Sequence, residues 1–69
     1  MPLSMVSDGE SFLITKIMGK EEVCRFLENL GFVAGAHVSL VSKIGGNVIV
    51  QLKESRVAIS KEMAQKIIV

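Results

Sequence analysis

The sequence contains no tryptophan or tyrosine, and only three phenylalanines among its 69 residues. It therefore offers no obvious aromatic platform on which unpaired bases could stack. Its net charge of +1 also leaves no surplus of lysine and arginine to neutralise phosphates. Both shortages argue against nucleic-acid binding. The length predicts one domain over residues 1–69.

The chain has one cysteine, Cys24, and so cannot form an internal disulfide bond. Secreted domains of this size normally carry several disulfides. The N-terminal segment contains Asp8 and Glu10 and has no basic start, which is not typical of a signal peptide. No apolar run approaches the roughly 20 residues that span a bilayer. We therefore expect a cytoplasmic protein without direct membrane insertion.

Apolar residues, by contrast, are abundant: 49% of the chain is hydrophobic, and the mean hydropathy is +0.48. A domain of this size buries only about 60% of the surface that its unfolded chain exposes. Contiguous apolar surface left outside the core usually marks an interface. Some of this surface is therefore expected to meet a partner protein or a second copy of the chain.

The first half of the chain predicts a strand over Phe12–Met18, followed by a helix over Glu21–Leu30. The helix carries apolar residues at the i, i+3, i+4, i+7 spacing of one buried face. These residues are Val23, Phe26, Leu27 and Leu30.

The junction Gly31–Phe32 predicts how this helix ends. Gly31 falls where a helix end prefers left-handed geometry, which glycine adopts without steric cost. In such a Schellman motif, Phe32 would fold back onto Leu27 and stop the helix. Gly35 then lets the chain turn into the next strand.

Two strands, His37–Ile44 and Val48–Lys53, are expected to form a hairpin. A three-residue loop, Gly45-Gly46-Asn47, pairs Ile44 with Val48 and gathers the apolar residues on one face, with Gly46 or Asn47 left-handed. That face would comprise Val38, Leu40, Ile44, Val48, Val50 and Leu52.

The remaining pattern predicts a Glu54-Ser55 turn and a strand over Arg56–Ile59, which places Val57 and Ile59 beside Leu52 and Val50. A short helix over Lys61–Lys66, capped by Ser60, and a closing strand over residues 67–69 follow. Three methionines are expected to fill gaps in the core: Met5, Met18 and Met63. The fold class is mainly β with short helices. We predict a small SH3-like barrel of about five strands, with one internal helix and a short C-terminal helical turn.

The order of several short motifs resembles the FeoA family over essentially the whole chain. The matching residues are Pro2, Leu3, Gly9, Glu10, Ile14, Ile17, Gly19, Leu27, Leu30, Gly31, Phe32, Gly35, Val38, Ala58, Ala64, Ile67 and Val69. The resemblance implies an SH3-like fold, no catalytic residues, and a role in regulating or assembling iron uptake. The implied partner is the cytoplasmic G-protein domain of a FeoB-type ferrous iron transporter. The same fold ends some iron-dependent repressors, but this chain lacks their helix-turn-helix part.

Three residues are candidates for a metal site: Cys24, Glu28 and His37. Together with Glu21, which is also near Cys24 on the predicted helix, they offer a thiolate, two carboxylates and an imidazole, which can bind a divalent transition ion. Zinc and iron sites usually show paired cysteines or histidines at short spacing, however, and Cys24 and His37 are each single in this chain. We therefore expect no cofactor and no metal. Direct sensing of a transition metal through Cys24 and His37 remains the alternative function.

The outer sheet face is the candidate partner-binding surface, because aliphatic residues among basic ones are common at interfaces. It is expected to carry Lys43, Ile49, Gln51, Lys53 and Arg56. Arg56 has two interpretations: an arginine finger acting on a GTPase, or a solvated turn residue facing Glu54. No oriented nucleophile and base are evident, so we expect no enzyme. The leading hypothesis is a non-enzymatic protein-binding module.

Overall fold

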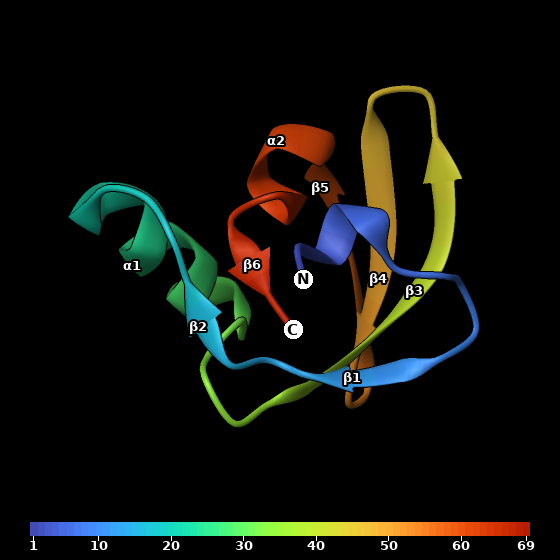
Figure 1. The fold of residues 1–69 in the computed structure, drawn as a ribbon, viewed down its shortest axis with the longest axis horizontal. Coiled ribbons are helices and arrows are strands. Elements are labelled where there is room, and N and C mark those ends of the chain that lie inside the picture. Colours follow the sequence, from blue (N-terminus) through green and yellow to red (C-terminus); the bar gives the residue numbers. More distant parts are fainter.

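The computed structural model describes residues 1–69 as six short strands, two α-helices and a 3₁₀ helix (Figure 1). In chain order the elements are η1 (Leu3–Met5), β1 (Ser11–Leu13), β2 (Lys16–Ile17), α1 (Glu21–Leu30), β3 (His37–Ile44), β4 (Asn47–Leu52), β5 (Ser55–Ser60), α2 (Lys61–Ala64) and β6 (Ile67–Ile68). The predicted mainly-β class, with one internal helix and a short C-terminal helical turn, is confirmed.

The strands form two sheets. One has four strands in the order β1-β3-β4-β5, and the other pairs β2 with β6. All neighbouring strands are antiparallel. There are thus six strands where about five were expected, and the sheets are not joined by hydrogen bonds into one closed barrel.

The extra strand arises because the predicted strand Phe12–Met18 divides between the two sheets. Around Ile14 the backbone leaves β3: the Ile14 amide donates to the Ala36 carbonyl over 2.8 Å, whereas the next amide, that of Thr15, donates to the Ile68 carbonyl over 2.8 Å. Period-two patterning shows which residues share a face but not which strand they pair with. A single apolar run therefore serves both sheets.

The β3–β4 hairpin corrects the predicted register. Ile44 pairs with Asn47, so the loop contains only Gly45 and Gly46. Gly45, rather than Gly46 or Asn47, takes the positive φ, at 58°. A positive φ at the first central residue of a two-residue loop is the arrangement that type II′ hairpin turns require.

A β-bulge reconciles this short loop with a buried apolar face. The register shifts between Leu40 and Ser42, which leaves Val41 as the additional residue. Beyond the bulge, Leu40 pairs with Val50, and both are buried as predicted. On the loop side of the bulge the faces are exchanged, so that Ile44 is 61% exposed instead of buried.

The β4–β5 turn also differs from the prediction by one residue. Leu52 pairs with Ser55, so the turn residues are Lys53 and Glu54. Val57 therefore pairs with Val50, and Ile59 with Val48, whereas the prediction paired them with Leu52 and Val50. Each β5 residue thus pairs with a β4 residue two positions away from the predicted one. Because side chains alternate between the faces, a shift of two residues keeps every side chain on its expected face.

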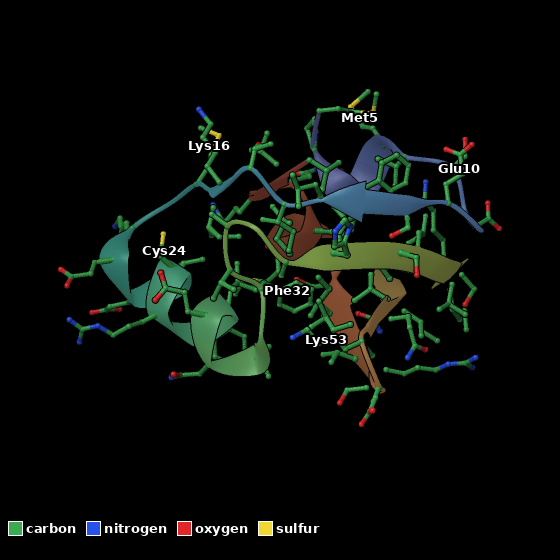
Figure 2. The ribbon with its side chains drawn as sticks, turned by 90° about the horizontal axis from the view of Figure 1, so that it is seen from below. Met5, Glu10, Lys16, Cys24, Phe32 and Lys53 are labelled. Atoms are coloured by element: carbon green, nitrogen blue, oxygen red, sulfur yellow. The ribbon has the colours of Figure 1, made fainter.

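The core lies between the two sheets and is closed by residues from η1, α1 and α2. Its 13 members are Leu3, Val6, Ile14, Leu27, Phe32, Val38, Leu40, Val48, Val50, Leu52, Ile59, Ala64 and Ile67. Phe32 is the largest fully buried side chain, and it lies near the centre of the molecule in Figure 2. Of the three methionines expected in the core, Met63 packs against it, whereas Met5 and Met18 are exposed.

The end of α1 has the geometry of a Schellman motif. Gly31 has a φ of 107°. Its amide donates to the Glu28 carbonyl over 2.9 Å, and the Phe32 amide donates to the Leu27 carbonyl over 3.0 Å. Gly31 thereby ends the helix and directs Phe32 into the core.

The C-terminal elements form much as predicted, with a shorter helix. α2 begins at its cap, Ser60, whose hydroxyl accepts a hydrogen bond from the Met63 amide over 3.2 Å. β6 then pairs with β2 and is also bridged by Pro2 through Ile68. The first and last residues of the chain therefore lie side by side (Figure 1).

Candidate docking surfaces

Helix α1 presents an apolar surface to solvent. Its apolar residues share one side, as the spacing predicts, but only Leu27 is fully buried. Phe26 is 51% exposed and Leu30 is 36% exposed, which corrects the prediction of one buried face. Val33, just beyond the helix, is 42% exposed. Figure 1 shows the cause: α1 lies to one side of the sheets, so that only part of its apolar side reaches the core.

An apolar groove separates α1 from the C-terminal part of β5 and from α2. Phe26 and Leu30 form one wall, and the groove has a volume of about 240 Å³. The opposite side is lined by Ala58, Ile59, Ser60 and Met63. We call the hollow lined by these six residues the apolar groove. Contiguous exposed apolar side chains are typical of surfaces that bind other proteins.

A second surface lies on the outer face of the four-stranded sheet. Strand register places Ser11 opposite Ser39, Ser39 opposite Gln51, and Gln51 opposite Arg56. Residues directly opposite one another in antiparallel strands share a face. Four polar side chains therefore form one row across all four strands.

His37 and Lys53 lie beside this row and line the same hollows. The largest depression of the molecule, about 560 Å³, runs from Leu30 to these two residues. Two smaller depressions, of about 240 and 370 Å³, are also lined by His37 and Lys53. We call the row together with these two residues the basic patch; it comprises Ser11, His37, Ser39, Gln51, Lys53 and Arg56.

Three of the predicted partner-binding residues, Gln51, Lys53 and Arg56, thus come together. Ile49 also faces outward, opposite Ala58, but it is half-buried. Lys43 does not join them: on the loop side of the bulge it pairs with the buried Val48, which places it on the inner face of the sheet near its edge. Lys43 there lines a small hollow with Ser4, Gly45, Asn47, Val48 and Lys61.

Arg56 does not face Glu54, as its turn interpretation required. Its Nε donates a hydrogen bond to Oε1 of Gln51 over 2.9 Å. Gln51 in turn donates from Nε2 to the carbonyl of Lys53 over 3.0 Å. This short chain of contacts holds the Arg56 guanidinium against the sheet. Sequence reasoning considered His37 only as a metal ligand, although its place in the alternating pattern already put it on the outer face.

The metal candidates are not brought together. The Cys24 thiol lies 3.8 Å from the carbonyl oxygen of Ile17 and 3.7 Å from that of Gly19. In Figure 2, Cys24 lies on α1, well away from Lys53, the neighbour of His37. Nowhere in residues 1–69 do three or more histidine, cysteine, aspartate or glutamate side chains form a group suited to a metal ion.

Comparison with known proteins assigns the family. The sequence profile of the FeoA domain matches residues 1–69. The chain belongs to the FeoA family. No curated protein sequence matches this FeoA-family chain significantly. None of its helices combines the length and the apolar character that crossing a membrane requires.

Two solved FeoA structures share the fold over most of their length. An iron uptake regulatory protein, FeoA, has a TM-score of 0.89 at 24% identity, over 97% of this chain and 91% of that one. FeoA of Stenotrophomonas maltophilia in complex with zinc has a TM-score of 0.86 at 28% identity, over 100% of this chain and 88% of that one. The latter is described as a prokaryotic SH3-domain protein and a candidate activating factor for ferrous iron transport. The SH3-like fold class is thereby confirmed.

The same fold also occurs inside larger proteins. A manganese-dependent transcriptional repressor has a TM-score of 0.88 at 17% identity, over 97% of this chain but only 39% of that one. At this identity the likeness concerns the fold alone. The FeoA fold is therefore used both as a separate chain and as part of a longer one.

Proposed function

We propose that this FeoA-family chain is a non-enzymatic, cytoplasmic protein-binding module that regulates or assembles a FeoB-type ferrous iron transporter. Its partner would be the cytoplasmic G-protein domain of that transporter. The observation that carries the proposal is the uncovered apolar side of α1. A small domain with a slim stability margin gains nothing from exposing Phe26 and Leu30 in the absence of a partner.

The apolar groove supplies the affinity in this proposal. Full burial of a phenylalanine or leucine side chain is worth about 1.5–3 kcal/mol. Phe26 is half-exposed, and its burial against a partner would recover about half of that. Regulation then follows from differential binding, because a ligand shifts a conformational equilibrium only by its difference in affinity for the two states. Binding that varies with the bound nucleotide would have this effect.

Sensing of a transition metal through Cys24 and His37 is the competing function, although it would require these two residues to come together, which they do not do in this structure. The zinc complex of the relative at 28% identity is what supports it. Titration with ferrous iron or zinc distinguishes the two functions: a sensor binds one equivalent and loses it in Cys24→Ala. A protein-binding module keeps its partner affinity in that variant.

The test of the proposed function is calorimetric titration of the chain with the transporter's soluble G domain, in its nucleotide-free, GDP and GTP-analogue states. Phe26→Ser should weaken binding at least about tenfold, since the loss of a buried aromatic anchor typically costs 2 kcal/mol or more. Met5→Ser is the matched control, because Met5 is also an exposed apolar residue but lies on η1, away from α1 (Figure 2). Absence of binding in every nucleotide state would overturn the proposal.

A further inference from the structure

The basic patch combines unpaired hydrogen-bond donors with positive charge. The hydroxyls of Ser11 and Ser39 and the Lys53 ammonium make no hydrogen bond within the chain, and Arg56 uses only its Nε. The single ion pair of the molecule joins Glu21 and Arg25 on α1, so neither cation of the patch is neutralised. Several donors on one face are therefore free to bind a ligand.

Carboxylates are distributed so as to leave this patch open. The chain has seven acidic residues. Most lie on the helices or in the segment before β1: Asp8, Glu10, Glu21, Glu22, Glu28 and Glu62. Glu54 follows Lys53 in the turn and lines the largest depression on its α1 side. None of the six residues of the patch is acidic, so its charge complements an anion.

Backbone strain points to the same place. Lys53 has a φ of 44° and is the one non-glycine residue of the chain with a positive φ. Glycine or asparagine would adopt this conformation with less strain. Strained residues that persist often serve a function, and the inference runs from the observed outlier to the function. Here the strained residue is a lysine that lines three hollows of the surface.

We infer that the basic patch binds carboxylate side chains of an acidic, extended polypeptide segment. The inference rests on the proposed function, because it assigns such a segment to the protein partner. Opposite residues of the row stand about 5 Å apart on neighbouring strands. A segment crossing the sheet can therefore bring some of its acidic side chains within reach of Ser39, Arg56 and the neighbouring Lys53. The largest depression continues from Lys53 to Leu30, so the same partner can reach the apolar groove.

The experiment is an NMR titration of the ¹⁵N-labelled chain with capped hexaglutamate, with capped hexaglutamine and with inorganic phosphate. Hexaglutamate should give saturable shifts at the amides of the patch, weakened by salt because the pairs are exposed. Lys53→Gly and Arg56→Gln should each lower the affinity about threefold, and about tenfold together, as expected for exposed charge pairs. Glu54→Gln, which removes a neighbouring negative charge, should raise it.

Lys53→Gly also separates binding from folding. It relieves the positive φ, so its Tm should rise while its affinity for hexaglutamate falls. Equal shifts with hexaglutamate and hexaglutamine, or phosphate binding at the patch as tightly as the peptide, would overturn the inference. If hexaglutamate binds while the G domain does not, the patch stands and the proposed partner is wrong. If the G domain binds and hexaglutamate does not, the carboxylate assignment alone fails.

Discussion

The four-stranded sheet and helix α1 both carry regular apolar patterns, but they bury them to different extents. In β4 every second residue, Val48, Val50 and Leu52, is buried. In α1 only Leu27 is, and Phe26 remains half-exposed. Periodicity determines which side chains share a face, but a face is buried only where another element covers it. The inner face of the sheet is covered by η1, α2 and β6, which contribute Leu3, Ala64 and Ile67 to the core, whereas most of the apolar side of α1 has no such cover (Figure 1).

The two hairpin turns differ in a related way. Both place a positive φ at the first turn residue: Gly45 at 58° and Lys53 at 44°. Glycine adopts this geometry freely, whereas lysine adopts it under strain. The glycine turn minimises conformational strain, and the lysine turn keeps a charged side chain at the basic patch.

The contrast between core and helix predicts the largest effect on stability. Phe32→Ala should lower the free energy of unfolding by about 3–5 kcal/mol, because it leaves a cavity among fully buried side chains. Phe26→Ala should lower it by less than about 1 kcal/mol, since most of its lost contacts are at the surface. Urea denaturation followed by circular dichroism measures both. Equal losses would mean that α1 is as well packed as the sheets.

The junction between α1 and the core predicts an intermediate effect. Gly31→Ala should cost about 1–2 kcal/mol, because an alanine strains the positive φ. Its Cβ would also lie 3.3 Å from Cδ1 of Leu52. Gly35→Ala is a useful comparison, since Gly35 has a positive φ but nothing within 4 Å of the added carbon. A smaller loss for Gly31→Ala than for Gly35→Ala would contradict the role of the Leu52 contact.

The two turns predict the smallest changes, with opposite signs. Gly45→Ala should destabilise the chain by about 1 kcal/mol, since it introduces strain at a position where space is free. Lys53→Gly should stabilise it by about 0.5–1 kcal/mol, because strain relief exceeds the added freedom of the unfolded chain. Thermal unfolding of both variants checks the signs. A loss of stability in Lys53→Gly would show that the lysine side chain stabilises its own turn.

Local rules predicted much of the fold. The end of α1 needed only a glycine and the apolar residue after it, and the closing strand only its apolar run. The predicted β3–β4 register was wrong. It assumed a three-residue loop, whereas a bulge at Val41 allows a loop of only two residues while Leu40 and Val50 stay buried. Apolar alternation can be satisfied by a longer loop or by a bulge, and the sequence does not distinguish them.

The sequence alone determined which residues are apolar at strand and helix spacing, where the helix ends, and to which family the chain is similar, because these depend on residue type and order. The tertiary structure decided which faces are covered, because coverage depends on elements distant in sequence. It divided one predicted strand between two sheets, left Phe26 in solvent, and aligned Ser11, Ser39, Gln51 and Arg56 across four strands. Both candidate docking surfaces arise from these long-range placements.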